Sequence, residues 1–383
     1  MPARAEGAET TPLGLYLHIP FCSAICHYCN FNRGLIDEPL RAAYVDAVCT
    51  HIGREAEPVA VDTIYFGGGT PSLLSPVEIA RLIDACRSAF VLSAETEITM
   101  EANPETVDVQ RLRGFRESGV TRLSFGVQSF RDDELKRLGR VHTAARARAA
   151  IDEARTAGFD NVSVDLMMWL PGQSVAQWLE SVDALIAAGP DHASLYLLEL
   201  YPNAPLQEVM AREQWSRTPD DDAADMYEDA MARLEGAGFR QYEISNVART
   251  GRESRHNLKY WRDSGWLAFG CGAHGSRHGR RWRHVAETRA YVDRVAAGAD
   301  PIAQSRTLDR ETQLAEALFM GLRLVDGIAE DTYRARFDQD VWSRYGIALS
   351  PALEAGLLIR DDEGMRLTRR GMLLANEVMR VFV

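Results

Sequence analysis

Three of the six cysteines in this 383-residue chain fall within eight residues, and their spacing suits metal binding. Cys22, Cys26 and Cys29 form a C-x3-C-x2-C pattern, which lets three thiolates converge on one inorganic centre. Thiolates are soft ligands that suit iron–sulfur clusters and also zinc. Three thiolates on a four-iron cluster leave one iron without a protein ligand, and that iron can bind a substrate or cofactor. The alternatives are a zinc site of three cysteines and either His18 or His27, and a loop of unrelated free thiols.

The remaining cysteines, Cys49, Cys86 and Cys271, are scattered along the chain. The chain is long and rich in apolar residues, so it does not depend on disulfide bonds to fold. A reducing compartment would also keep thiols free. We therefore expect these three residues to be free thiols outside the metal site.

Short β-rich runs alternate with amphipathic segments of helical period along most of the chain. Strands are predicted at Leu15–Ile19, Thr63–Phe66, Glu97–Glu101, Arg122–Val127, Asn161–Leu166, Ala193–Leu198 and Gln241–Ile244. Helices are predicted at Leu40–Gly53, Pro76–Phe90, Val107–Ser118, Thr143–Ala157, Val175–Ala188 and Asp220–Gly236. Repeated strand–helix units predict an α/β fold, a parallel sheet with helices outside. Six or seven such units favour a complete or partial barrel over a doubly wound sheet.

Polar residues follow the expected strands at their carboxyl ends, which is where active sites of such folds lie. The first strand runs into Cys22, and the second runs into the segment Gly67-Gly68-Gly69-Thr70. The next four strands lead in turn to Glu101, Gln128, Asp165 and Glu199. We therefore expect one site at this edge of the sheet.

The C-terminal part has a different pattern and is predicted to form a small module. Gly, Ala, Asp and Pro cluster at Ala296–Ser305, which indicates a break. Two or three helices follow, then a hairpin of Leu358–Arg360 and Met365–Thr368, then a last helix. This order resembles a winged-helix-like α+β module. The expected organisation is a flexible tail at 1–12, a barrel at 13–300 and the module at 306–383.

The overall charge argues against nucleic acid or anionic lipid as partners. Lys and Arg number 43 against 55 Asp and Glu, which gives a formal net charge of −12. No apolar run approaches the roughly 20 residues of a membrane helix. The first residues contain no apolar signal region. We expect a cytoplasmic protein with no integral membrane segment and no nucleic-acid partner.

The cysteine loop after a first strand resembles that of the radical S-adenosylmethionine (SAM) superfamily. The resemblance implies a 4Fe-4S iron–sulfur cluster whose open iron binds the amino and carboxylate groups of SAM. It also implies reductive cleavage of SAM to methionine and a 5′-deoxyadenosyl radical, with an electron donor such as flavodoxin or ferredoxin. The fold that it implies is a partial (β/α)6 TIM-like barrel, in agreement with the strand–helix pattern.

The glycine-rich segment resembles the loop that faces the methionine moiety of SAM in this superfamily. Without a Cβ, its backbone can approach a ligand closely. The coproporphyrinogen-dehydrogenase-like branch implies a SAM site of Tyr16, Gly68, Gly69, Thr70, Glu101, Gln128, Arg140, Asp165 and Glu199. Glu101, Arg140 and Asp165 can bind the amino, carboxylate and ribose groups, in an order that the sequence leaves open. For Arg140, the alternative is a surface ion pair.

Two features distinguish between members of this branch. Phe31 stands where the dehydrogenases that make protoporphyrinogen carry a further cysteine. His256–Trp261 fits the H-N-x-x-Y-W motif of the HemW-type haem chaperones, and Gly270–Gly275 resembles their G-x-G-A-H segment. This resemblance covers about residues 13–383, including a HemN-type C-terminal module. It implies a protein that binds haem and transfers it to acceptors such as respiratory enzymes.

The same motif supplies candidate haem-binding residues. They are His256, Asn257, Tyr260 and Trp261, with His256 as an axial iron ligand and the two aromatic rings on the porphyrin face. His274 is a second candidate ligand. The alternative for His256 is a hydrogen bond within the fold. The competing functions are oxidative decarboxylation of coproporphyrinogen III, radical SAM methylation, and a zinc-binding scaffold.

Overall fold

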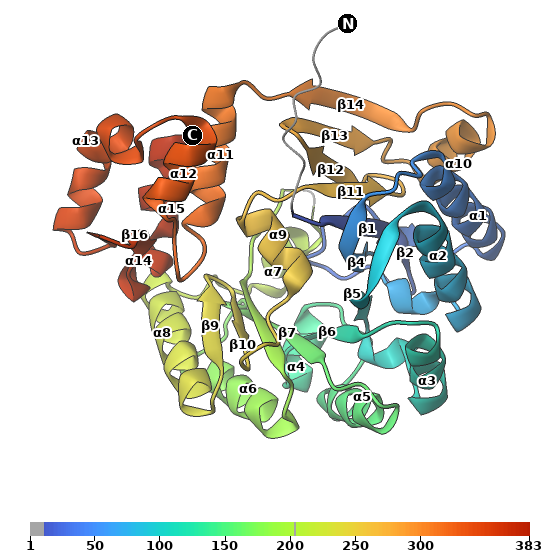
Figure 1. Cartoon of the computed structure of the whole chain (residues 1–383). Helices are drawn as coiled ribbons and strands as arrows, with labels where there is room; N and C mark the ends of the chain where they lie inside the picture. Colours follow the sequence, from blue (N-terminus) through green and yellow to red (C-terminus); the bar gives the residue numbers. More distant parts are fainter. Residues whose placement is uncertain (1–10, 203) are drawn as a thin grey trace, which may run out of the picture.

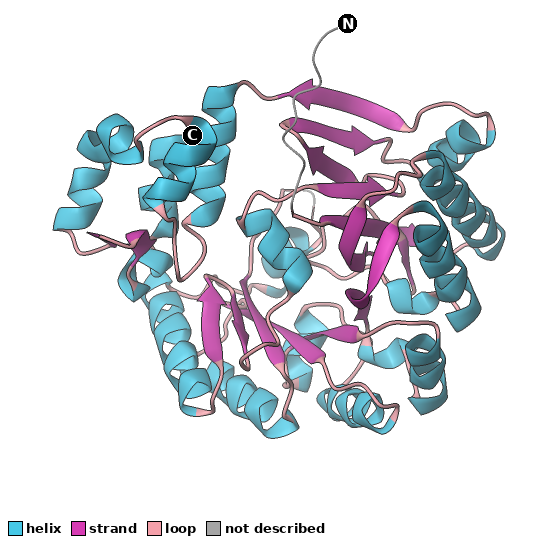
Figure 2. Ribbon diagram, viewed as in Figure 1, coloured by secondary structure: helices cyan, strands magenta, loops and turns pink. Residues whose placement is uncertain are grey.

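The computed structural model describes residues 11–202 and 204–383. The first ten residues of the predicted tail lie outside this range. Within the described residues, the centre of the molecule is one sheet of 12 strands. Figure 2 shows this sheet as a curved layer with helices along its outer side.

Six strands in the middle of the sheet form the parallel core. They are β1 (Leu13–Ile19), β4 (Ala60–Gly68), β5 (Val91–Ala102), β6 (Arg122–Gln128), β7 (Val162–Met168) and β8 (His192–Leu197). Each is parallel to the next. The helices outside them are α1 (Glu38–Arg54), α2 (Pro76–Ala89), α3 (Val109–Glu117), α5 (Ala144–Thr156) and α6 (Val175–Ala188). The predicted α/β partial barrel is confirmed.

The alternation of residues along β1 explains how the barrel separates core from site. Leu15 and Leu17 are fully buried in the main apolar cluster, together with Val45 and Ile52 of α1. Successive side chains of a strand point to opposite faces, so Tyr16 lies on the inner face of the barrel. Apolar burial against the outer helices thus stabilises the sheet, while its inner face carries polar residues.

Two sets of further strands extend the sheet on both sides. β11 (Trp266–Phe269), β12 (His274–Arg277), β13 (Arg280–His284) and β14 (Ile302–Thr307) continue it beyond β1. Beyond β8 come β10 (Asn246–Ala248) and β9 (Arg240–Glu243), which follows α8 (Asp220–Gly236). The predicted strand Gln241–Ile244 therefore exists as β9, but it is not part of a seventh parallel strand–helix unit, and the further strand that is parallel to β1 is β11. β9 and β10 form an antiparallel hairpin, because the connection is too short for a crossover helix.

The C-terminal module begins with α11 (Arg310–Gly321), α12 (Glu330–Phe337) and α13 (Val341–Glu354). The predicted hairpin follows as β15 (Leu358–Asp361) and β16 (Gly364–Leu367), then α14 (Arg369–Leu373) and α15 (Ala375–Met379). The module has its own apolar cluster. The predicted break at 296–305 contains the start of β14, so the large sheet continues to Thr307. This edge strand is almost wholly exposed, and its polar sequence therefore resembles a loop.

Before the C-terminal module, the helices of the described residues that were not predicted are α4 (Asp132–Arg137), α7 (Leu206–Glu213), α9 (Arg255–Trp261) and α10 (Thr288–Ala296). α9, which carries the H-N-x-x-Y-W motif, contacts both β4 and α11 and so lies between barrel and module. Among residues 11–202 and 204–383, no helix combines the length and apolarity that a membrane span requires.

Candidate functional site

A cavity of about 380 Å³ opens at the carboxyl ends of the parallel strands. Its walls come from the cysteine loop and from β4 to β8, as the strand-end pattern predicts for a barrel. The sequence-predicted residues that line it are Cys22, Cys26, Cys29, Gly68, Gly69, Thr70, Glu101, Gln128, Arg140, Asp165 and Glu199. The structure therefore brings these residues, which lie far apart in the sequence, to one place.

Cys22 ends β2 (Phe21–Cys22), and Cys26 and Cys29 lie on the loop between β2 and β3 (Gly34–Leu35). All three thiols are free, and burial raises the pKa of Cys22 and Cys29. The end of α4 holds this loop in place. The His27 backbone N–H donates to the Leu138 carbonyl at 3.0 Å, and the His27 Nδ1 lies 2.9 Å from the Arg137 carbonyl oxygen.

The zinc alternative requires His18 or His27 as a ligand beside the three cysteines. Among the described residues, no three His, Cys, Asp or Glu side chains are close enough together to hold one metal ion. His18 uses both ring nitrogens within the fold, at 3.1 Å from the Tyr16 hydroxyl and 2.7 Å from the Asn32 carbonyl oxygen. His18 is therefore not available as a zinc ligand in this structure. His27 also has one nitrogen engaged.

Arg140 lies between the cysteine loop and the end of β6. Its Nη2 donates to the Asn103 Oδ1 and to the Gly126 carbonyl, each at 2.7 Å. Its Nη1 donates to the Cys26 Sγ at 3.4 Å, and its Nε is buried without a hydrogen-bond partner. The alternative of a surface ion pair is therefore wrong. A guanidinium that lines the cavity is suited to an anionic group such as a carboxylate.

Two carboxylates face the same cavity. Glu101 accepts hydrogen bonds from the Tyr65 hydroxyl at 2.9 Å and from the Gly68 backbone N–H at 3.1 Å. Burial raises the Glu101 pKa to about 7, although these hydrogen bonds act in the opposite direction. Asp165 accepts from the Ser124 hydroxyl at 3.2 Å, and burial raises its pKa as well. Both carboxyls can receive hydrogen bonds from an amino or hydroxyl group of a ligand.

The glycine-rich loop passes close to the backbone before the cysteines. A Cβ on Gly69 would lie 2.7 Å from the Phe21 carbonyl oxygen, and one on Gly68 would lie 2.5 Å from the His18 ring. Gly68 also has a φ of 113°, which L side chains rarely adopt. The next residue, Thr70, lies with its hydroxyl 3.7 Å from the Cys22 Sγ. The glycines are thus needed for packing of this loop as well as for approach to a ligand.

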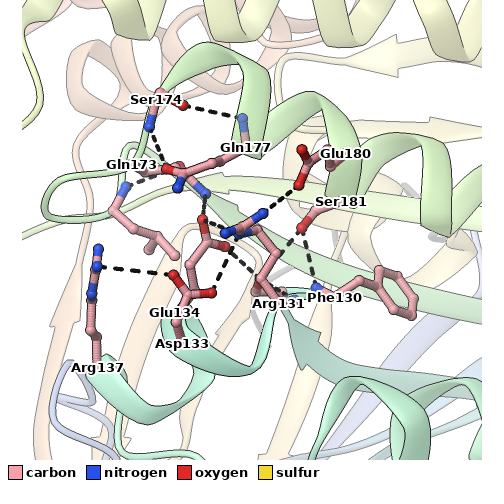
Figure 3. A network of polar contacts seen from close by, with 12 residues as sticks. Phe130, Arg131, Asp133, Glu134, Arg137, Gln173, Ser174, Gln177, Glu180 and Ser181 are labelled. Atoms are coloured by element: carbon pink, nitrogen blue, oxygen red, sulfur yellow. Dashed lines mark hydrogen bonds and ion pairs between the residues drawn. The ribbon is translucent and has the colours of Figure 1, made fainter.

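Gln128 ends β6 in a left-handed conformation, with a φ of 70°. A buried polar network fixes the segment that follows it (Figure 3). Glu134, which is 1% exposed, accepts from the Ser129 hydroxyl and from the Gln173 Nε2, the latter at 3.1 Å. Sequence reasoning missed Glu134, because it stands in an acidic run that resembles a solvated helix start. Glu134 anchors α4, and α4 in turn holds the cysteine loop.

Tyr16 is the one predicted SAM residue that does not line the cavity. Its ring stacks on that of Tyr65, with centroids 6.2 Å apart, and its hydroxyl contacts His18. Tyr16 therefore lies behind the wall of the cavity and supports it.

The predicted haem residues on α9 are held within the fold. His256 is fully buried, with Nδ1 2.8 Å from the Thr63 hydroxyl and Nε2 2.9 Å from the Tyr260 hydroxyl. Burial lowers its pKa to about 3. In this structure neither ring nitrogen is free for iron, which favours the alternative of a hydrogen-bonded histidine over an axial ligand.

The other haem candidates also lie outside the cavity lining. The Arg323 guanidinium covers the Trp261 ring at 4.3 Å from its centroid, so one face of that ring is occupied. Asn257 lies in the first turn of α9, and its backbone N–H donates to the Ser254 cap at 3.4 Å. His274 is exposed at the start of β12.

Large apolar and aromatic side chains surround the mouth of the cavity. Phe31 is 63% exposed, Leu197 47%, Tyr196 42% and Tyr201 37%, and all four line the cavity. Sequence reasoning did not identify the last three. Exposed apolar groups gathered at a cavity mark a binding surface more often than a chance arrangement.

Two family models match the chain. That of the radical SAM superfamily matches residues 16–210, which include most of the cavity lining. That of the HemN C-terminal domain matches residues 308–374, directly after β14. Fold, site and matches together define the class, a radical SAM protein with a HemN-type C-terminal module.

Relatives of known name cover nearly the whole chain. The Bacillus subtilis protein named Heme chaperone HemW is 36% identical over 374 residues, which are 96% of this chain and 98% of the relative. The Escherichia coli protein of the same name is 34% identical, over 97% of this chain and 98% of the relative. Coproporphyrinogen III oxidase (HemN) from Escherichia coli superposes with a TM-score of 0.85 at 23% identity, covering 97% of this chain and 90% of that one. The chain therefore belongs to the radical SAM superfamily and, within it, to the family of proteins named Heme chaperone HemW.

Proposed function

We propose that the protein is a haem chaperone, which binds haem and transfers it to acceptor proteins. The observation that carries this proposal is the similarity to two proteins named Heme chaperone HemW over 96% and 97% of the chain. Such similarity includes both the barrel and the C-terminal module, so it extends beyond the shared radical SAM core.

Cys22, Cys26 and Cys29 would hold a 4Fe-4S cluster in this function, and SAM would bind in the cavity beside them. The cluster, when bound, supplies an electron and an open iron for SAM. Arg140 is suited to the SAM carboxylate, because its cationic side chain lines the cavity. Glu101 and Asp165 would receive hydrogen bonds from the amino and ribose groups.

The mouth of the cavity is the surface that best suits haem. A porphyrin is flat and largely apolar, and the exposed side chains of Phe31, Tyr196, Leu197 and Tyr201 can pack on its face. The α9 residues suit this role less well, since His256 is fully buried and hydrogen-bonded on both nitrogens.

The second candidate is an enzyme, coproporphyrinogen III dehydrogenase. Its support is the common fold with HemN, and at 23% identity that similarity concerns the fold alone. Phe31 stands where such dehydrogenases carry a further cysteine, which favours the chaperone. No observation favours a methyltransferase.

The proposal is tested by haem binding and transfer. The full-length protein, with its cluster reconstituted under anaerobic conditions, is titrated with haem and then mixed with a haem-free acceptor such as an apocytochrome of the b type. We expect one haem to bind per chain and then to appear in the acceptor. Absence of saturable haem binding, or haem that stays on the protein, would overturn the proposal.

A further inference from the structure

α9 places the H-N-x-x-Y-W motif against the inner face of the barrel. His256 contacts Thr63 of β4 at 2.8 Å, on the inner side of the sheet. The sequence makes room for it at Gly14 of β1, where a Cβ would lie 3.0 Å from the His256 ring. The helix thus fills the interior of the barrel beneath the cavity.

A short chain of contacts connects His256 to the cavity. The His256 ring stacks on the Tyr65 ring, with centroids 5.2 Å apart and an angle of 28° between the planes. The Tyr65 hydroxyl then donates to Glu101 at 2.9 Å. Tyr65 and Glu101 both line the cavity, whereas His256 does not.

The His256 ring has one fixed orientation. The Thr63 hydroxyl lies 2.8 Å from one nitrogen and the Tyr260 hydroxyl 2.9 Å from the other. A ring held at both ends presents a rigid flat surface to Tyr65. The Tyr65 ring thus contacts two rings, with centroids 5.2 Å from that of His256 and 6.2 Å from that of Tyr16.

From this geometry we propose that His256 is a positioning residue of the SAM site. It holds the Tyr65 ring, which fixes the Glu101 carboxyl for the ligand, and it is not the axial ligand of haem iron. The inference rests on the SAM site of the proposed function and gives the H-N-x-x-Y-W motif a role there. It is independent of whether the protein transfers haem.

Contacts elsewhere on α9 make it feasible to change His256 alone. The Lys259 Nζ forms an ion pair with Asp62 at 2.6 Å and donates to the Pro12 carbonyl at 2.7 Å. The Ser254 hydroxyl caps the helix, and Arg323 covers Trp261. The helix therefore keeps several anchors when the imidazole is removed.

The test measures the dissociation constant for SAM by isothermal titration of the full-length, cluster-loaded protein. His256→Ala is expected to weaken SAM binding about threefold to tenfold, the effect of one misplaced hydrogen-bonding group. Tyr65→Phe, which removes only the hydroxyl that contacts Glu101, is expected to weaken it by a similar factor. In the double variant the factors should not multiply, because both substitutions break the same chain of contacts.

A matched control distinguishes positioning from general stability. His51 is also buried, and its Nδ1 lies 2.9 Å from the Tyr291 hydroxyl, outside the cavity lining. His51→Ala is expected to lower the melting temperature without changing SAM affinity. Should His256→Ala fail to fold, Tyr260→Phe removes one of the two hydrogen bonds to the imidazole and is measured in its place.

Several outcomes would overturn the inference. The first is an unchanged SAM affinity in folded His256→Ala. The second is a double variant in which the losses of SAM affinity of the two single variants multiply. The third is a His256→Ala protein that loses its haem absorbance and keeps its SAM affinity. A wild-type protein that does not bind SAM would overturn it as well. A wild-type protein that binds SAM but no haem would overturn the proposed chaperone function. The inference about His256 would then still be decided by the SAM affinities of the variants.

Discussion

The Arg140 Nη1 donates a hydrogen bond to the Cys26 Sγ at 3.4 Å, across a sequence separation of 114 residues. The same guanidinium donates to Asn103 and to the Gly126 carbonyl. It therefore joins the cysteine loop to the ends of β5 and β6. This contact links the proposed cluster site to the proposed SAM site.

Replacement of Arg140 by Ala should weaken SAM binding at least tenfold, because the variant loses a cation that lines the cavity. Arg140→Lys should recover little of this loss, since an ammonium group cannot reach Asn103, Gly126 and Cys26 together. The measurement is the dissociation constant for SAM in cluster-loaded protein. Arg212→Ala, at an arginine that is 72% exposed, is the control and should leave the value unchanged. Equal affinities in Arg140→Ala and wild type would contradict the assignment.

Cys26→Ala should abolish the four-iron absorbance of the reconstituted protein. Two remaining thiolates cannot hold the cluster as three do. Cys49→Ser removes a thiol that does not line the cavity and should keep the full absorbance. Absorbance and iron content per chain check both variants. Normal iron content in Cys26→Ala would exclude this cysteine as a ligand.

Loss of the Glu134 carboxyl should loosen the cysteine loop. Glu134→Ala leaves Ser129 and Gln173 without their buried partner, which costs about 2 kcal/mol of unfolding free energy. Glu134→Gln keeps an acceptor and should cost less. Asp133→Asn, at the neighbouring and more exposed carboxylate, is the control. Denaturant unfolding and the rate of iron loss to a chelator are measured. If iron is lost no faster from Glu134→Ala than from Asp133→Asn, the conclusion that α4 holds the cysteine loop is contradicted.

The buried Glu101 makes the stability of the ligand-free protein depend on pH. Its pKa rises from 4.5 to about 7 on folding, so between these values the folded chain keeps a proton that the unfolded chain has lost. Stability from this group is complete below pH 4.5 and is lost as the pH rises towards 7. Between pH 4.5 and about 7, the unfolding free energy of wild type should therefore fall relative to that of Glu101→Gln. Above this range the difference between the two proteins should stay constant. A constant difference across the range would show that the carboxyl has its ordinary pKa.

A charge at the mouth of the cavity should weaken haem binding. Leu197 is 47% exposed and lines the cavity, so Leu197→Asp is expected to raise the dissociation constant for haem about tenfold without loss of stability. Ile347→Asp, on the C-terminal module at a residue that is 96% exposed, is the control. Equal haem affinity in both variants would place the haem elsewhere.

The pattern of strands and their carboxyl ends was sufficient to locate the cavity. Glu101 and Asp165 could be identified because they end buried strands, and parallel strands bring such ends together. The cysteine triplet is a local pattern that needs no tertiary information. Tyr16 remains a predicted SAM residue, and the sequence could not show that Tyr65, and not Tyr16, lines the cavity.

Other features depend on tertiary contacts that sequence periodicity does not reveal. α9 is short, and its buried positions include His256 and Lys259, so it has no apolar stripe. β14 is a polar edge strand, which pairs through its backbone. Glu134 has one hydrogen-bond partner nearby in the chain, Ser129, and one from the distant loop before α6, Gln173. His256 and Glu134 are buried polar residues with hydrogen-bond partners on distant segments, and β14 is an exposed strand whose ladder partner is β13.

The most direct test of the chaperone account is an assay for porphyrinogen oxidation by the same preparation that binds haem. The anaerobic, cluster-loaded protein is incubated with a reductant, SAM and coproporphyrinogen III, and the products are separated by chromatography. The account predicts one haem bound per chain and no protoporphyrinogen. Formation of protoporphyrinogen with release of carbon dioxide would contradict it and identify the protein as a dehydrogenase.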